Sequence, residues 1–349
     1  MPQAPPVVAE VRRGDHVESL HRGDAAVVDE NGRHLARFGD PERPIFLRSA
    51  AKPFQALPLL EAGGAERFGL TPADVALICA SHGGEPRHVR GAARLLRKGG
   101  FRPTDLVCGP HLPAHEPSAR ALLTSGQRPS RLHNNCSGKH AGLLLACRLL
   151  GFPRKGYWEP SHPVQLAIRR RLSALAAVPE ADIDSAVDGC GLTVFRLPIA
   201  ALALAYARLL ARSLAGETGA ERRARSLVLR AMWDRPDMVA GTGFFTTAFL
   251  VAGRRRWIGK EGAEGVYAVG LRASAAGGRS AGIALKIEDG SARARAAVTL
   301  ALMREMGWMP RARRRALAPF EAPVIENTAG AVVGSIDAKV PIIRRDAAG

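Results

Sequence analysis

The sequence has few aromatic residues and no long apolar run, and these shortages exclude whole classes of protein. Aromatic residues make up 5% of the 349 residues, which is too few for an obvious base-stacking surface on a nucleic acid. The most apolar window, residues 197–210, is too short to cross a bilayer and contains Arg208. The formal net charge is +18, but the arginine clusters are scattered and accompany no recognition motif. We therefore expect no membrane span and no specific nucleic-acid partner.

Cysteine is scarce, and an export signal is not recognisable. The chain has five cysteines, an odd number that argues against a disulfide framework. Cys79, Cys108 and Cys147 lie in apolar surroundings, where we expect them to pack as small hydrophobic side chains. Residues 1–23 carry charged side chains and no apolar stretch, so they do not resemble a signal peptide. These features predict a cytoplasmic protein.

Lysine is rare among the basic residues, and its positions are informative. Only seven of the fifty basic residues are lysines. Three of the seven, Lys52, Lys139 and Lys260, lie in short segments with small or polar neighbours. Arginine keeps its proton in a protein, whereas a buried lysine can lose it and act as a base or a ligand. We therefore predict that these three positions need an amine that can be deprotonated.

Both ends of the sequence show strand patterns. Residues 7–12 and 16–21 alternate apolar and polar side chains. The turn residues from Asp29 to Gly32 predict a hairpin between the segments on either side of them. Residues 265–271 and 280–287 predict another hairpin near the other end.

The middle of the chain is mostly helical by its residue pattern, for example in residues 140–150 and 163–177. We therefore predict an α+β fold, with a largely antiparallel sheet built from N- and C-terminal segments and an inserted helical region. In this interpretation residues 1–349 are a single catalytic chain. Residues 1–50 and 250–349 form the sheet, and residues 51–249 form the mostly helical part.

The first candidate catalytic pair is Ser49-x-x-Lys52. Residues three apart on a helix lie on the same face, so the hydroxyl and the amine can meet. A serine at a helix N-terminus also has backbone N–H groups nearby for an oxyanion. A neutral Lys52 could take the proton of Ser49 and create a nucleophile without histidine.

Two further segments follow in an informative order. Ser81-His82-Gly83 comes next, and Lys260-Glu261-Gly262 comes late in the chain. Penicillin-binding proteins and serine β-lactamases order their sites as S-x-x-K, then S-x-N or S-x-G, then K-T-G. This loose match predicts that Ser81 and Lys260 join Ser49 and Lys52 in one serine–lysine site.

The third group is Cys136-x-x-Lys139 together with Cys190, within the helical part. Two thiolates from separate segments and a nitrogen donor would suit zinc. Asp188 or His140 could orient such ligands. The alternative is a pair of polar-loop cysteines in a substrate pocket.

These segments resemble the rhizobial-type (class 3) L-asparaginase family. The block from His133 to Gly142 is highly specific, and the likeness extends over nearly the whole chain. The matching blocks, in family order, are residues 48–53 (RSAAKP), 81–85 (SHGGE), 108–113 (CGPHLP), 133–142 (HNNCSGKHAG), 188–191 (DGCG) and 260–266 (KEGAEGV). The resemblance implies a fold like that of serine β-lactamases and glutaminases, a homodimer, and hydrolysis of L-asparagine to L-aspartate and ammonia.

The resemblance also implies roles for individual residues. Ser49 with Lys52 is one catalytic pair, and Ser81 with Lys260 is a second pair beside it. The three residues that match the family's zinc ligands are Cys136, Lys139 and Cys190; in the family this metal helps substrate binding more than hydrolysis. The candidates to hold the charged groups of the amino acid are Arg48, His133, Asn134 and His140, and the alternative for Arg48 is a structural ion pair.

Some positions depart from the family pattern. Phe244 stands where an arginine is usual, Thr246 offers no acidic group, and Gly83 stands where a second serine is frequent. These differences put substrate preference in doubt. The alternatives are a glutaminase or another small-carboxamide amidase, and a catalytically weakened member that binds an amino acid or zinc. Hydrolysis of β-lactams or D-peptides shares the S-x-x-K order, but it usually takes place outside the cytoplasm.

Overall fold

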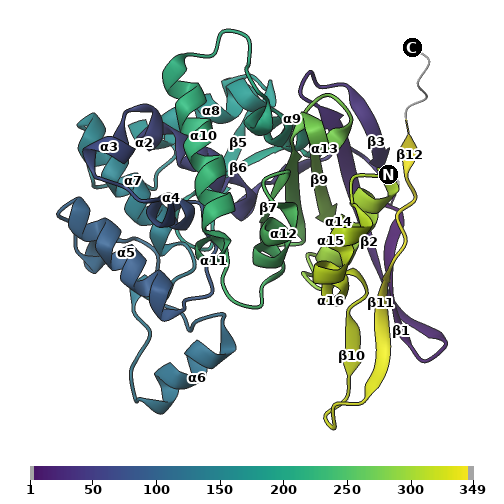
Figure 1. Ribbon diagram of the computed structural model, residues 1–349. Coiled ribbons are helices and arrows are strands. Elements are labelled where there is room, and N and C mark those ends of the chain that lie inside the picture. Colours follow the sequence, from purple (N-terminus) through teal and green to yellow (C-terminus); the bar gives the residue numbers. More distant parts are fainter. Residues whose placement is uncertain (1–3, 345–349) are drawn as a thin grey trace.

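The computed structural model describes residues 4–344, and its centre is a curled antiparallel sheet with helices on both faces (Figure 1). Both ends of the chain contribute strands to it, as predicted. The strand order is β10 (Val324–Glu326), β11 (Val332–Ala338), β1 (Val7–Arg13), β2 (His16–Asp29), β9 (Ala281–Ile287), β8 (Val266–Leu271) and β7 (Trp257–Glu261). Strand β3 (His34–Phe38) pairs with β2 and with β12 (Ile343–Arg344). The predicted α+β class is confirmed.

Helices fill most of the chain between the two strand-forming ends. This helical part contains α1 (Lys52–Gln55), α2 (Leu57–Glu61), α3 (Gly64–Arg67), α4 (Pro72–Ile78), α5 (Pro86–Lys98), α6 (Glu116–Thr124), α7 (Ser137–Leu150), α8 (Pro163–Ala176), α9 (Ile199–Leu210), α10 (Gly219–Asp234) and α11 (Pro236–Val239). The later helices are α12 (Phe245–Gly253), α13 (Ala273–Ala276), α14 (Arg295–Glu305), α15 (Arg311–Arg314) and α16 (Ala318–Glu321). No helix in residues 4–344 is long and apolar enough to cross a membrane.

The second half of strand β2 contains a short apolar run, residues 25–28 (AAVV), and the packing of the sheet explains it. Successive residues of a strand point to opposite faces of the sheet. Ala26 and Val28 pack into the core shared with the helical part, whereas Ala25 and Val27 pack into a second core under α12 and α14. Because both faces of the sheet are covered there, residues 25–28 have no polar side, whereas the first half of β2 is mostly exposed.

Helix α9 lies directly on the sheet, against β2, β8 and β9. Two glycines allow this close approach. A Cβ at Gly282 would collide with the Ala203 carbonyl, and one at Gly270 would lie 2.7 Å from the Tyr206 carbonyl oxygen. Nearly every residue of α9 is buried, because the helix is covered by the sheet on one side and by other helices elsewhere.

A second, three-stranded sheet lies within the helical part of the molecule. Its strand order is β4 (Pro44–Phe46), β6 (Thr193–Pro198) and β5 (Asp184–Val187). The sequence pattern did not predict it, because these strands are only three to six residues long. Strand β4 leads directly into the segment with Ser49, so this sheet anchors one side of the candidate site.

Candidate active site

Ser49 and Lys52 lie where β4 ends and the helical part begins. The 3-10 turn η1 (Arg48–Ala51) runs directly into α1, so the two residues are one turn apart, as predicted. The Tyr206 hydroxyl on α9 donates to the Ala50 carbonyl at 2.8 Å and holds this turn in place. Ser49 is half-buried, and its hydroxyl has no hydrogen-bond partner within residues 4–344. It is therefore available to a ligand.

Arg48 connects this turn to the loop that carries Cys190. Its Nε donates to Asp188 Oδ1 at 2.8 Å, and Asp188 also accepts from the Gly189 backbone N–H. The φ angle of Arg48 is +49°, in the left-handed region that non-glycine residues rarely adopt. Such strain persists only where the surroundings hold it, and it clusters at functional sites.

The Ser81 hydroxyl oxygen lies between two lysine amines. Lys52 Nζ is 2.9 Å from Ser81 Oγ and Lys260 Nζ is 2.8 Å from it. Both lysines are buried, and Lys52 also donates to the Ala80 carbonyl at 2.5 Å. The Ser81 backbone N–H donates to the Val239 carbonyl, which fixes the loop after α4. The structure thus brings Ser81, Lys52 and Lys260 together, and the Lys52 amine bonds to Ser81 rather than to Ser49.

The surroundings of Lys260 make its proton easy to lose. Burial lowers the pKa of Lys260 to about 8, with Lys52 acting in the same direction and the Glu261 carboxylate acting against them. Glu261 Oε1 lies 2.6 Å from Lys260 Nζ. Burial alone would raise the pKa of Glu261, but the charges of Lys260 and Arg295 hold it below its ordinary value. Lys260 can therefore exchange a proton near neutral pH.

The two predicted cysteines and Lys139 form a second cluster beside the first. Lys139 Nζ donates to Cys190 Sγ at 3.0 Å. A hydrogen bond from the Cys190 thiol lowers the pKa of Cys136 well below its ordinary value, and the positive charges of Lys139 and Lys52 act in the same direction. Burial alone would lower the pKa of Lys139, but the two cysteines raise it. The cluster is a thiolate held by a thiol and by charged amines.

These donors fit the zinc ion that the family resemblance implies. Two sulfur ligands and one nitrogen ligand would leave a fourth position open, as in zinc sites that bind substrate or water. Within residues 4–344, no three histidine, cysteine, aspartate or glutamate side chains group to hold a metal, so Lys139 would have to be a ligand. It would first have to release its proton.

The predicted substrate-binding residues are placed differently from one another. His133 is half-buried and bonds through Nδ1 to Ser130, whereas the Asn134 side chain bridges the Gly109 carbonyl and the Cys136 N–H. His140 is fully buried. Its Nδ1 lies 2.9 Å from the Tyr157 hydroxyl, and its Nε2 has no partner within residues 4–344. The Asn134 side chain and His140 Nδ1 are thus engaged by other residues of the protein.

Two buried histidines stabilise the loop that carries Ser81, and the sequence did not single them out. His82 Nδ1 accepts from the Gly84 N–H, and its Nε2 lies 2.9 Å from Ser137 Oγ on α7. His88 accepts from the Glu85 N–H and lies 2.9 Å from the Asp237 carbonyl. Burial lowers the pKa of both histidines, that of His82 well below its ordinary value. Both are therefore neutral and act as hydrogen-bonding spacers.

Two of the departures from the family pattern lie in contact with each other. A Cβ at Gly83 would be 2.7 Å from Phe244 Cε2 and 3.2 Å from Phe244 Cζ. The half-buried Phe244 ring therefore occupies the space that a side chain at position 83 would need. The third departure, Thr246, donates its hydroxyl to Glu261. All three lie close to Ser81 and Lys260.

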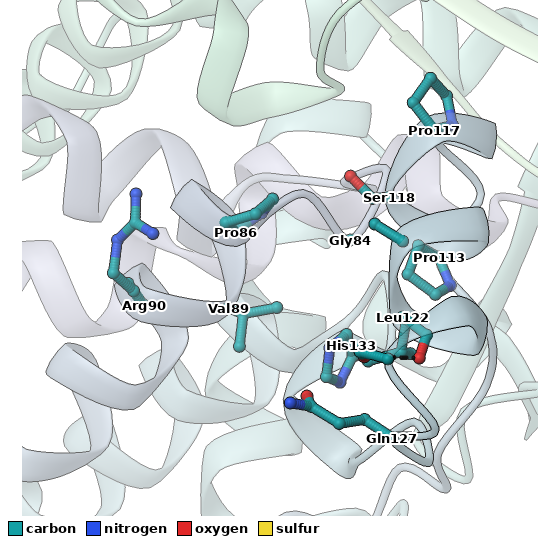
Figure 2. A pocket seen from close by; sticks show the side chains of 12 residues that line it. Gly84, Pro86, Val89, Arg90, Pro113, Pro117, Ser118, Leu122, Gln127 and His133 are labelled. Atoms are coloured by element: carbon teal, nitrogen blue, oxygen red, sulfur yellow. Dashed lines mark hydrogen bonds between the residues drawn. The ribbon is translucent and has the colours of Figure 1, made fainter.

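A cavity of about 520 Å³ lies beside the Ser81 loop. Figure 2 shows Val89 and Pro86 on one side of it and Pro113 and Leu122 on the other. Its lining is mostly apolar and includes Gly84 and the predicted substrate-binding residue His133, but none of the predicted serines, lysines or cysteines. The cavity adjoins the candidate site without containing its chemistry, so we place the site at the Ser81 cluster.

Comparisons with known proteins place this geometry in context. A family model described as L-asparaginase II matches residues 9–338. No curated protein matches the chain significantly. Among solved structures, the Bacillus subtilis glutaminase YbgJ, in covalent complex with 5-oxo-L-norleucine, is 14% identical over 82% of this chain and 88% of its own, with a TM-score of 0.39. A protein named Mglu is 15% identical over 82% of this chain and 67% of its own, with a TM-score of 0.35.

At these TM-scores the likeness is distant and carries no functional inference. The family match is different in kind, because it spans nearly the whole chain and includes every predicted site residue. The chain therefore belongs to the L-asparaginase II family.

Proposed function

We propose that this protein hydrolyses L-asparagine to L-aspartate and ammonia by serine–lysine acyl transfer. Family membership supports an amidohydrolase that acts on asparagine or glutamine. The observation that carries the finer proposal is the Ser81 hydroxyl between two buried lysine amines, at 2.9 and 2.8 Å, with Lys52 one turn from Ser49.

In this mechanism Ser49 is the nucleophile. Lys52 first passes its own proton through Ser81 to a neutral Lys260. It then takes the hydroxyl proton while Ser49 Oγ attacks the carbon of the side-chain carboxamide, and backbone N–H groups stabilise the oxyanion. The proton then passes to the amide nitrogen, the C–N bond breaks, and ammonia leaves a β-aspartyl ester on Ser49. Water attacks this ester and its proton passes to the same amine. The amine returns that proton to Ser49 Oγ as the C–O bond breaks, which releases aspartate and restores the Ser49 hydroxyl.

Ser81 and Lys260 complete the proton path in this proposal. The Lys260 amine, the Ser81 hydroxyl and the Lys52 amine form a continuous hydrogen-bonded row. A proton can therefore move between the two lysines through one hydroxyl. The free Ser49 hydroxyl is the better nucleophile candidate, because the Ser81 oxygen is already engaged by two donors.

We also propose that Cys136, Lys139 and Cys190 hold a zinc ion. When bound, the ion supplies a positive charge that helps to hold a carboxylate of the substrate. Arg48, which the Asp188 carboxylate holds in place, is a candidate for the same task. A homodimer is part of the proposal, and light scattering on the purified protein measures it.

The decisive experiment is ammonia release from L-asparagine and L-glutamine by the purified protein, with Ser49→Ala and Ser81→Ala alongside. We expect asparagine turnover that S49A abolishes, and a mass increase of one β-aspartyl group on Ser49 in rapidly quenched samples. Label on Ser81 instead would exchange the roles of the two serines. Turnover of glutamine alone would make the protein a glutaminase. No release from either amide, with or without zinc, would falsify the proposed function.

A further inference from the structure

Glu261 makes an unusual contact with its neighbour in the sequence. Lys260 and Glu261 are the last two residues of β7, and adjacent strand residues normally point to opposite faces. Here the Glu261 carboxylate reaches the Lys260 amine, with Oε1 2.6 Å from Nζ. The same amine lies 2.8 Å from Ser81 Oγ. The amine is thus held by the Glu261 carboxylate and by the Ser81 hydroxyl at the same time.

The second carboxylate oxygen of Glu261 is also held. It accepts a hydrogen bond from the Thr246 hydroxyl on α12, and Thr246 Oγ1 lies 3.2 Å from the Tyr267 hydroxyl on β8. Arg295 of α14 donates to the Gly262 carbonyl at 2.8 Å, next to Glu261 in the chain. Both oxygens are therefore fixed by partners on different elements, which leaves the carboxylate little freedom to turn away from Lys260.

The other groups around Lys260 do not balance its charge. The residues with titratable or charged side chains that face it or Glu261 are Lys52 on α1, Cys79 directly after α4, Arg295 on α14, Tyr267 on β8 and Tyr206 on α9. Lys52 and Arg295 carry charge of the same sign as Lys260 and favour loss of its proton. Glu261 is the carboxylate within hydrogen-bond distance of the amine, and it acts in the opposite direction.

We propose that Glu261 is a positioning residue of the hydrolysis, which holds the Lys260 amine against the Ser81 hydroxyl and sets the pH at which that amine loses its proton. The catalytic part of this inference rests on the proposed function. The electrostatic part rests only on the contact between Glu261 and Lys260. The two parts are tested separately below.

The electrostatic part is tested by titrating lysines with NMR in the unmodified protein and in Glu261→Gln. Only seven lysines are present, so labelled lysine signals can be assigned with single substitutions. We expect the pKa of Lys260 to fall by about one unit or more in E261Q, because an adjacent opposite charge typically shifts a pKa by that amount. Thr246→Val is the matched control, since it frees the carboxylate but keeps its charge. A Lys260 pKa that is the same in E261Q would overturn the proposal.

The catalytic part is tested with the pH profile of kcat/KM. The limb of this profile, the part that rises as Lys260 loses its proton, should move to lower pH in E261Q, by the same amount as in the NMR titration. We also expect a lower kcat. A purely structural role would lower the rate at every pH and leave the limb in place, which would contradict the proposal. In T246V we expect a lower kcat and an unmoved limb.

Glu261→Asp covers the case in which E261Q does not fold. It keeps the charge but shortens the side chain, so we expect kcat to fall at least tenfold while KM changes less. An unchanged kcat in E261D would overturn the positioning role. If the unmodified protein releases no ammonia, the NMR titration still decides whether Glu261 controls Lys260. Failure of the proposed function is thereby distinguished from failure of this inference.

Discussion

Lys260 and Lys139 are both buried amines hydrogen-bonded to a neighbouring side chain, Ser81 and Cys190 respectively, yet their surroundings have opposite electrostatic effects. Burial and the nearby charge of Lys52 lower the pKa of Lys260 to about 8, although Glu261 opposes them. Burial would lower the pKa of Lys139 as well, but Cys136 and Cys190 raise it. The serine cluster (Ser49, Lys52, Ser81 and Lys260) therefore holds a proton that can move. The cysteine cluster (Cys136, Lys139 and Cys190) instead favours a protonated Lys139 beside a Cys136 thiolate. The same residue type serves two kinds of chemistry because its neighbours differ.

The largest expected effect is on kcat, and it distinguishes Lys260 from Lys139 when each is replaced by methionine. Lys260→Met removes an amine from the proton path, and we expect kcat to fall on the order of 10²–10⁴-fold. Lys139→Met leaves that path intact, so we expect its main effects on bound zinc and on KM. Steady-state kinetics and metal analysis measure both. Lys155→Met is the matched control, since Lys155 is exposed. Equal losses of kcat in K260M and K139M would contradict the assignment of only Lys260 to the proton path.

The cysteine cluster is tested by removing one thiol. Cys190→Ser takes away the partner that most strongly lowers the pKa of Cys136. We expect the thiolate absorbance of Cys136 to appear at higher pH than in the unmodified protein. Zinc affinity should fall about 10–100-fold, since removal of a ligand is at least as costly as loss of a supporting contact. Cys147→Ser is the control, because Cys147 is buried away from the cluster. An unchanged thiolate titration in C190S would contradict this account.

The serine cluster also depends on packing between its two loops. Gly83→Ala places a methyl group against the Phe244 ring, and we expect a loss of about 1–3 kcal/mol in the free energy of unfolding. Phe244→Leu in the same chain should restore part of it, because a smaller side chain frees that space. Chemical denaturation of the two single variants and the double variant measures the coupling. If the two effects simply add, the residues do not share the space.

The smallest expected effect concerns His82. Its ring bonds to Gly84 in the loop that carries Ser81 and to Ser137, the residue after Cys136. Its pKa is lowered by burial, so below about pH 6.5 the unfolded chain binds more protons than the folded one. Stability therefore falls as the pH drops from 6.5. His82→Gln cannot take up the proton, and we expect it to reduce this loss by about 1 kcal/mol between pH 6.5 and 5.5. Denaturation curves at both pH values measure it; an identical slope in H82Q would exclude His82 as the cause.

Much of this architecture follows from the sequence. The turn residues from Asp29 to Gly32 join β2 and β3, and the predicted helix at 163–177 appears as α8. Cys79, Cys108 and Cys147 are buried, as expected for small hydrophobic residues. Long periodic segments and turn residues carry enough local information for such predictions, because each pattern repeats several times.

The missed features depend on contacts between distant segments. Strand β6, directly before α9, is defined by its pairing with β4 on one side and β5 on the other, and no local pattern predicts it. The contact between Phe244 and Gly83 joins two loops whose proximity no local pattern encodes. Glu261 was overlooked as a partner of Lys260 because strand alternation predicts that adjacent residues point apart. An acidic residue beside a buried lysine was nevertheless a signal that could have been used.

The pairing of β2 with β9 has a consequence for synthesis of the protein on the ribosome. Val27 pairs with Ile283, so about 250 residues must be added after β2 emerges before its partner exists, which takes roughly 10–50 s at ordinary elongation rates. Throughout that time the apolar strand has an open edge. Folding of a sheet with such distant pairings is also intrinsically slow. Lys260 reaches Ser81 only when this sheet closes, so every incomplete nascent chain lacks the serine–lysine cluster and exposes a strand that chaperones can bind.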